Sequence, residues 1–274
     1  MERLSNARDF LATAQGFLAD RELTCGLKLG VTQLLIHEPQ VCPSAWFAVI
    51  RCYGEIRGCA LQTPPRNLVI SELDRESAEA LAEFLAQVQA QFPAVHGPAA
   101  SASAFAEAWA RRQCVRSRNE LDLRLFSLKR VKFRPSVPGV MRLAKPRDAS
   151  LVTHWFRAFH REAIPRDPVD PVGIARRALD AGRVFVWDHG GPVCLAAVGR
   201  ELATSASIGP VYTPPERRGE GYATALVSAL SQYVLDAGKR QACLFTDLAN
   251  PISNHIYPRI GYEPISDFRD IAFE

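Results

Sequence analysis

The sequence has no apolar run long enough to cross a bilayer. None of its stretches approaches the ~20 apolar residues that a membrane-spanning helix needs, and the chain is charged from Glu2 onward rather than signal-like. Its 47% apolar and 23% charged residues are ordinary for a globular protein and exclude disorder as the main state. We therefore expect a globular protein of the cytoplasm with no membrane partner.

Metal-ligand spacing is also missing. The seven cysteines form no Cys-x-x-Cys pair and the six histidines are scattered, so we expect reduced, mostly buried cysteines and no metal site. The net charge of +4 is spread over both halves without a dense basic stripe, which disfavours nucleic acid as a partner. These absences leave few functional signals, and the clearest is a glycine-containing turn with two arginines.

This turn lies between an extended apolar run that ends at Thr213 and an amphipathic helix predicted from Tyr222 to Ala237. Unpaired amides at the start of a helix favour an anion, and glycine lets a phosphate approach the backbone closely. The turn lacks the Lys-Ser/Thr pair of a P-loop and the third glycine of the dinucleotide fingerprint, and the alternative is a solvated surface turn. We predict a cradle for a pyrophosphate, made by Arg217, Arg218, Gly219, Glu220, Gly221, Tyr222, Ala223 and Thr224.

A second informative segment covers residues 244–262. An apolar strand ends at Asn250-Pro251, a cap residue followed by proline at the first helical position, and a short helix then closes at Gly261. With these two segments the chain resembles the GNAT superfamily of N-acyltransferases, which take an acyl group from acyl-coenzyme A. The resemblance covers roughly residues 138 to 274. It rests on an Arg/Gln-x-x-Gly-x-Gly/Ala pattern and a later Asn-capped helix with a tyrosine, matched by Arg218, Gly221, Ala223, Asn250, Tyr257, Gly261 and Tyr262.

The order of elements repeats on either side of residues 133–139, where prolines and a glycine interrupt regular structure. Each half reads as a strand hairpin, a further strand, a long helix, a short helix and a closing strand, which indicates an α/β (α+β) fold. We predict two tandem GNAT-like domains, each a mixed, mostly antiparallel twisted sheet flanked by helices. Residues 1–134 would form a degenerate N-terminal copy, and residues 135–274 the catalytic N-acetyltransferase domain.

The first copy differs from the second in the residues that carry the chemistry. Its equivalent of the turn has no glycine to admit a phosphate, and Asp74, Glu76 and Glu79 complement the helix dipole with the protein's own carboxylates. Trp109 stands roughly where the second half has Tyr257, and indole is no acid. We therefore expect the first copy not to bind the coenzyme.

The resemblance implies direct transfer of an acetyl group from acetyl-CoA to a primary amine of a small or amino-acid-like acceptor. Backbone groups of Val211, Tyr212 and Thr213 would hold the pantetheine arm. The N–H near Val211 would receive the oxyanion, and such a donor contributes about 3–4 kcal/mol.

Two positions of the short helix complete the expected coenzyme site. Tyr257 is the expected general acid for the leaving thiolate, but Pro258 directly follows it and is expected to bias its backbone away from the helical region. Asn250 is expected mainly as a helix cap and, through the resemblance, also as a contact to the coenzyme.

The general base is the least determined part of this site. Residues 205–207, where relatives often carry a glutamate, have none, and Glu201 a little upstream is the candidate that we adopt. A chain of waters would also serve. On the first helix of this half, His154, His160 and Glu162 stay open as alternatives. In the loop after it, Asp167 and Asp170 would suit a cationic acceptor, although Arg166 partly offsets them.

Two other functions also stay open. One is a coenzyme-binding sensor or scaffold that has lost catalysis, and the other is a protein N-acetyltransferase. The chain is expected as a monomer or a homodimer.

Overall fold

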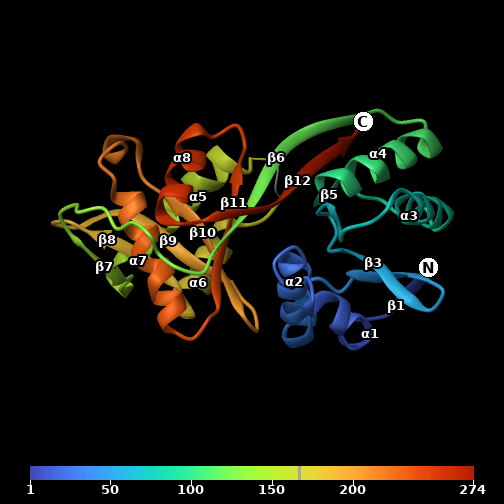
Figure 1. The fold of residues 1–274 in the computed structure, drawn as a ribbon, viewed down its shortest axis with the longest axis horizontal. Coiled ribbons are helices and arrows are strands. Elements are labelled where there is room, and N and C mark those ends of the chain that lie inside the picture. Colours follow the sequence, from blue (N-terminus) through green and yellow to red (C-terminus); the bar gives the residue numbers. More distant parts are fainter. Residues whose placement is uncertain (166–167) are drawn as a thin grey trace. The chain divides into compact units, whose positions relative to one another are not determined.

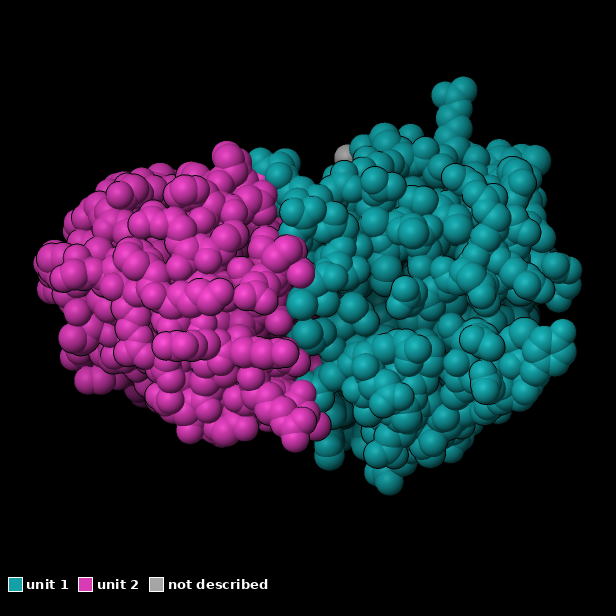
Figure 2. Space-filling model, viewed as in Figure 1, with its two compact units in different colours: residues 1–125, 247–249, 265–274 teal, residues 126–246, 250–264 magenta. Residues whose placement is uncertain are grey.

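The computed structural model describes residues 1–165 and 168–274 (Figure 1). They divide into two compact units, which Figure 2 shows in different colours. Unit 1 comprises Met1–Leu125, Asp247–Ala249 and Ile265–Glu274, and unit 2 comprises Phe126–Thr246 and Asn250–Pro264. The end of the chain therefore belongs to the unit that also contains its beginning. The domain limits expected from the sequence, 1–134 and 135–274, stay a prediction.

Unit 1 is a mixed sheet with helices, in the order β1-β2-β3-β4-β5-β12-β6. β1 to β4 pair antiparallel, β4 and β5 pair in parallel, and β12 joins β5 antiparallel with Phe268 opposite Pro98. The elements are β1 (Glu2–Leu4), α1 (Ala7–Ala19), α2 (Gly26–His37), β2 (Trp46–Cys52), β3 (Glu55–Gln62), β4 (Leu68–Ile70), α3 (Arg75–Gln87), β5 (Ala94–Pro98), α4 (Ala99–Gln113), β6 (Ser117–Leu128) and β12 (Glu263–Phe273).

Unit 2 repeats this plan with the strand order β11-β10-β9-β8-β7. Neighbouring strands pair antiparallel except β10 and β11, which are parallel as β4 and β5 are in unit 1. Its elements are β7 (Val140–Leu143), α5 (Ala149–Ala163), α6 (Pro171–Asp180), β8 (Val184–Asp188), β9 (Pro192–Glu201), β10 (Ser205–Tyr212), the short 3-10 helix Pro215–Arg217, α7 (Tyr222–Asp236), β11 (Gln241–Asp247) and α8 (Pro251–Ile260). The predicted α/β fold with a mostly antiparallel sheet is confirmed in both units.

The sheet of unit 2 is buried on both faces, so its strands are almost continuously apolar. Cys194, Ala196 and Val198 of β9 pack in one core cluster with α7, because alternate residues of a strand share a face. Leu195 and Ala197 pack on the other face in a cluster with α5 and α6. Each face of the sheet is thus covered by its own helices.

A register shift in β10 changes which side chains face which core. The pairing with β9 shifts between Ala206 and Ile208 and again between Ile208 and Val211. As a result Ile208 and Val211 both contribute to the α7 side of the sheet, while Tyr212 is buried on the α5 and α6 side. The end of β10 thereby presents Tyr212 to the end of α5.

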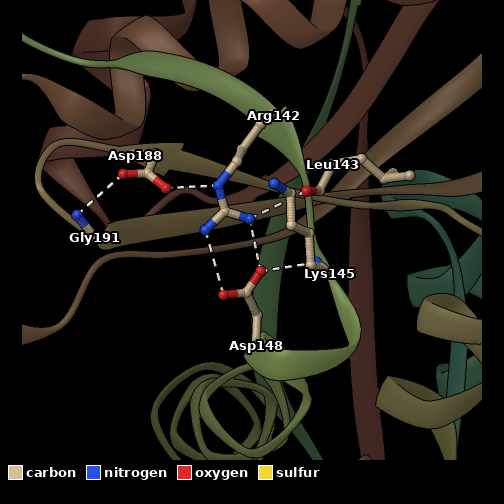
Figure 3. A network of polar contacts seen from close by, with 6 residues as sticks. All are labelled: Arg142, Leu143, Lys145, Asp148, Asp188 and Gly191. Atoms are coloured by element: carbon tan, nitrogen blue, oxygen red, sulfur yellow. Dashed lines mark hydrogen bonds and ion pairs between the residues drawn. The ribbon is translucent and has the colours of Figure 1, made fainter.

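A network around Arg142 fixes the start of α5 (Figure 3). Arg142 Nη1 and Nη2 donate to the two carboxylate oxygens of Asp148 at 2.6 and 3.3 Å, and Nε donates to Asp188 at 2.5 Å. Asp148 also accepts from Lys145 N–H at 2.7 Å, and Asp188 from Gly191 N–H at 3.0 Å. The hydrogen bonds from Arg142 lower the pKa of both carboxyl groups. The guanidinium of Arg142 in β7 therefore connects this strand to Asp188 of β8 and to Asp148, the residue before α5.

Among the described helices, none is both long enough and apolar enough to span a membrane. The seven cysteines are free, and five of them are buried.

Candidate functional site

The parallel strands β10 and β11 separate after a short paired stretch. They pair from Ser205 opposite Gln241 to Ser207 opposite Cys243, and the described residues show no further pairing between them. β10 nevertheless continues to Tyr212 and β11 to Asp247. On its β11 side, the end of β10 therefore has backbone groups free to pair with an extended ligand.

The loop after β10 opens directly into α7. Gly219 and Gly221 both have φ +83°, in the left-handed region that glycine adopts without strain. Gly221 is the N-cap and supplies no side-chain oxygen, and Ala225 N–H donates to Gly221 O at 3.0 Å. The amides that precede Ala225 in the first turn have no carbonyl of the helix to bond, and no described side chain caps them. This is the arrangement that accepts an anion.

The close approach of the backbone to other atoms also restricts Gly221. A Cβ at this position would lie 3.2 Å from Val137 Cγ1, while a Cβ at Gly219 would meet no atom within 4 Å. The space where a Cβ of residue 219 would lie is thus unoccupied, whereas the backbone at Gly221 packs against the side chain of Val137.

The two arginines of the loop do not point the same way. Arg218 Nε donates to Thr213 O at 2.9 Å, and its Nη2 donates to Glu162 Oε2 at 2.7 Å. Its guanidinium also lies 5.8 Å from the centre of the Tyr212 ring. Arg217 instead forms a long ion pair of 4.0 Å with Glu220. The structure therefore brings Arg218, Tyr212 and Thr213 together and leaves Arg217 and Glu220 at the outer edge of the loop.

Glu162 is the carboxylate that contacts Arg218 and Tyr212. Tyr212 OH donates to Glu162 Oε1 at 3.2 Å, so each oxygen of Glu162 has one partner from the predicted coenzyme site. Burial and the Glu162 charge raise the pKa of Tyr212, so its phenol stays protonated. Glu162 was one of several open alternatives in the sequence, and the signal that could have singled it out is its position in the last turn of the helix before the loop.

The other residues of the predicted cradle contribute backbone rather than side-chain groups. The side chain of Tyr222 is buried, and its OH lies 2.7 Å from His189 Nδ1. Ala223 and Thr224 are partly exposed in the first turn of α7. Their amides, like that of Tyr222, belong to the uncapped helix start.

Helix α8 holds the two later residues of the predicted site. Asn250 caps it by accepting from Ser253 N–H at 3.1 Å, as expected. Tyr257 is buried beside Phe126 and Tyr262, with ring centres 6.4 and 5.8 Å away, and burial raises its pKa to about 12. The expected disturbance by Pro258 is wrong, because α8 continues through it to Ile260.

The structure does not bring Glu201 to Arg218, Tyr212 and Thr213. It ends β9 and pairs with Ala206 at the start of β10, about 17 Å along the strand from Val211 at a rise of ~3.3 Å per residue. It lines a cavity of about 220 Å³ together with Val198 and Ala206, which belong to the α7 side of the sheet. Its catalytic role stays a prediction, and the contacts that the structure shows give that role no support.

Of the two acidic residues singled out in the loop after α5, one caps a helix and the other lies outside the described residues. Asp170 caps α6 by accepting from Val172 N–H and Gly173 N–H, both at 2.9 Å. Asp167 lies outside the described residues. Among the described residues there is no group of three or more His, Cys, Asp or Glu side chains that could hold a metal ion.

The chain is similar to one family model and to several solved structures. Residues 192–269 match the model of the family described as FR47-like protein, whereas no curated protein sequence matches the chain. A solved protein from Drosophila is similar over 100% of this chain and 98% of its own, with a TM-score of 0.71 and 13% identity. A GCN5-related N-acetyltransferase from Kribbella flavida covers 91% and 95%, with a TM-score of 0.59 and 14% identity.

A third solved structure bears on the two-unit organisation. A tandem GNAT protein from the clavulanic acid biosynthesis pathway is similar over 84% of this chain and 82% of its own, with a TM-score of 0.52 and 14% identity. At such low identities the likeness is one of fold. The resemblance to the GNAT superfamily that the two sequence motifs predicted is confirmed in the fold.

Proposed function

We propose that this chain, which has the fold of the GNAT superfamily, is an N-acyltransferase that moves an acetyl group from acetyl-CoA to a primary amine by direct transfer. The observation that carries the proposal is the path from β10 to α7. The strand leaves its parallel neighbour after Ser207, and its free edge leads within a few residues to an uncapped helix behind Gly219 and Gly221. The proposed setting is the cytoplasm, where acyl-CoA is available.

The residues of unit 2 fit the coenzyme in two respects. The free edge of β10 suits the amide groups of a pantetheine arm, which Val211, Tyr212 and Thr213 would hold through their backbone. The amides from Gly219 to Thr224 suit a diphosphate, because they carry the partial positive charge of the helix start. When bound, acetyl-CoA supplies the activated acyl group.

The transfer requires an oxyanion site, a base and an acid. The amine nitrogen gains the acyl group as the C–S bond breaks, and one proton leaves the amine while one returns to the sulfur. The backbone N–H near Val211 is the proposed oxyanion donor. Tyr257 is the proposed acid, since burial keeps its phenol protonated at neutral pH.

Glu162 is the base that the contacts favour over Glu201. It reaches the end of β10 through Tyr212 and lies on the sheet face that α5 covers, whereas Glu201 lines a cavity on the α7 side. Glu162→Gln is expected to lower kcat about 100-fold, as loss of a general base does. Asp180→Asn is the matched control, because Asp180 is an exposed carboxylate that also pairs with an arginine, Arg176. A loss of kcat in Glu201→Gln with full activity in Glu162→Gln would return the role to Glu201.

The function itself is tested by thiol release from acetyl-CoA over a panel of small amines, with calorimetry for coenzyme binding. Amine-dependent thiol release with stoichiometric N-acetylated product is the expected result. Binding without turnover on small amines or on peptides would favour a sensor or scaffold. Turnover on peptide amines alone would favour a protein N-acetyltransferase. Absence of coenzyme binding would contradict all three functions.

A further inference from the structure

A half-buried arginine lies on the sheet of unit 2 without an anionic partner. The backbone N–H of Arg200, near the end of β9, donates to Ser207 Oγ at 2.8 Å. Arg200 therefore lies beside the residue at which β10 and β11 separate. Its Nε is shielded from solvent and has no hydrogen-bond partner in the described part of the chain, and no described carboxylate forms an ion pair with its guanidinium.

The environment of Arg200 disfavours its charge. Burial lowers the pKa of Arg200, because the guanidinium loses hydration there without gaining a carboxylate. A shielded charge is ordinarily paired, as Arg142 is with Asp148 and Asp188. The described residues thus supply no anion to the shielded guanidinium of Arg200.

Arg200 belongs to the sheet face opposite to Glu201. β9 advances three residues from Val198 to Glu201 while β10 advances two from Ile208 to Ala206, so the alternation of β9 is interrupted there. Val198 and Glu201 therefore both line the cavity on the α7 side, and Arg200 is not among the residues that line it. Cys243 is close enough to act on the charge of Arg200, and its neighbours Ala242 and Leu244 belong to the α7 side. Arg200 therefore shares the face to which Tyr212 and the end of α5 belong.

The position along β10 separates Arg200 from the proposed diphosphate site. Ser207 precedes Val211 by about 13 Å at a rise of ~3.3 Å per residue, and the loop of Gly219 and Gly221 follows beyond Thr213. A ligand group that meets Arg200 therefore lies on the side of the transfer point away from the diphosphate, which is the side left for the acceptor.

We propose that Arg200 binds a carboxylate of the acceptor, so that the substrate is an amine with a carboxylate a few bonds away, as in an amino acid. This proposal rests on the proposed acyltransferase function. A guanidinium keeps its charge and forms bidentate pairs with carboxylates, which fix orientation as well as add affinity. The acceptor's carboxylate then supplies the anion that the chain lacks and turns the amine toward the end of β10.

The experiment compares amines that differ only in the carboxylate: phenylalanine with 2-phenylethylamine, and alanine with ethylamine. The wild type is expected to have the higher kcat/KM on the carboxylate-bearing member of each pair. Arg200→Met is expected to lower that kcat/KM about 10- to 100-fold, mainly through KM, and to leave the other amines unchanged. Arg200→Lys should retain part of the preference. Arg183→Met is the matched control, since Arg183 Nε is also shielded but its Nη1 donates to Gly199 O at 3.0 Å.

Two further measurements do not depend on turnover. Calorimetry should show that N-acetylphenylalanine binds the wild type and binds Arg200→Met at least about 10-fold more weakly, with no such change for N-acetyl-2-phenylethylamine. Thermal unfolding of Arg200→Met should start no lower than in the wild type, because an unpaired charge has been removed.

The possible failures are distinguishable. A preference of the wild type for the amines without carboxylate, or an equal loss of Arg200→Met on both members of a pair, would overturn the carboxylate site. A lower unfolding temperature of Arg200→Met together with unchanged selectivity would show that Arg200 only packs. If the wild type acetylates no amine of any kind, the proposed function fails, and weak, Arg200-independent binding of the carboxylates in calorimetry would overturn this inference separately.

Discussion

Units 1 and 2 share a plan but treat the gap after their parallel strand pair in opposite ways. In unit 1, Lys28 Nζ donates to Ile70 O at 3.1 Å, and Ser101 Oγ accepts from Leu73 N–H at 2.8 Å. The chain thus satisfies with its own side chains the backbone that follows β4. In unit 2 the described residues leave the corresponding edge of β10 free. The same fold is closed in one unit and open in the other.

Close packing also keeps β4 beside β5. A Cβ at Gly97 of β5 would lie 2.5 Å from Ile70 Cγ1, so glycine is needed for the two strands to approach this closely. β10 in unit 2 instead extends well beyond its paired residues. We therefore expect a ligand that adds itself as a further strand to bind in unit 2 and not in unit 1.

The helix that follows shows the same contrast. Asp74 caps α3 by accepting from Ser77 N–H at 2.7 Å, and this hydrogen bond lowers the pKa of Asp74. Gly221 at the start of α7 offers no such oxygen. Unit 1 thus caps its helix start with a carboxylate of its own, whereas the described residues of unit 2 leave the start of α7 uncapped, as the proposed diphosphate site requires.

The largest expected effect is on the open helix start. Gly221→Asp should weaken coenzyme binding by more than about 100-fold, because it brings a carboxylate against the diphosphate in a conformation that glycine favours. Gly221→Asn is the control, since asparagine tolerates this backbone region and has no charge. Calorimetry should show one coenzyme per wild-type chain and none for Gly221→Asp. An unchanged affinity of Gly221→Asp would mean that the coenzyme site lies elsewhere, and residual binding to unit 1 would remove the contrast between the units.

The next prediction compares how much an ion pair at an edge strand contributes to the free energy of unfolding in each unit. Arg142→Met should lower the free energy of unfolding by about 3 kcal/mol, because it leaves the buried Asp148 carboxylate unpaired. Arg51→Met is the matched control in unit 1. Its ion pair with Glu2, at 2.9 Å, joins β1 and β2 with side chains 38% and 45% exposed, and its loss should cost less than about 1 kcal/mol. Denaturant unfolding at pH 7 measures both values.

The same network predicts a pH dependence. The pKa values of Asp148 and Asp188 are lowered in the folded state, so their contribution to stability is complete above their unfolded pKa of 3.8. It is lost as the pH falls below this value through the folded pKa values. The free energy of unfolding of the wild type should therefore fall more steeply in this acid range than that of Arg142→Met. Parallel curves would show that Arg142 does not stabilise the two carboxylates.

Tyr257 and Trp109 provide the third comparison. Tyr257→Phe should lower turnover about 100-fold with little change in coenzyme affinity, because only the proton donor is removed. Trp109→Phe, in the aromatic cluster of unit 1 with Phe92 and Phe105, should leave turnover unchanged. Because burial raises the pKa of Tyr257 to about 12, deprotonation of this phenol should not lower activity at neutral or mildly alkaline pH. Wild-type turnover in Tyr257→Phe would assign Tyr257 to packing alone.

The sequence predicted those parts of the molecule that depend on neighbouring residues. The helix start at Tyr222, the cap at Asn250 and the glycines of the loop are local signals, and the structure has them where they were expected. The orientation of Glu201 and the contact of Glu162 with Tyr212 depend instead on long-range pairing. Two register shifts in the pairing of β9 with β10 decide which face each of these residues takes, and no local pattern in the sequence predicts such shifts.

For the same reason, the sequence does not predict that β12 joins unit 1. Its alternating pattern predicted a strand, but alternation says nothing about which neighbour the strand joins. Pairing of Phe268 with Pro98 is a contact between residues far apart in the chain. A boundary inferred from prolines near residue 134 cannot detect that a later segment returns to the first unit.

The smallest expected effect tests whether the closed helix start of unit 1 is structural only. Asp74→Ala should lower the free energy of unfolding by about 1 kcal/mol, the ordinary contribution of an N-cap. Because the pKa of Asp74 is lowered in the folded state, this contribution is present above its unfolded pKa of 3.8 and disappears as the pH falls below it. Coenzyme affinity and the stoichiometry of one should stay unchanged, since the edge of β4 remains occupied by Lys28 and Ser101. A second coenzyme bound by Asp74→Ala would show that a single carboxylate, rather than the closed strand edge, keeps unit 1 from binding.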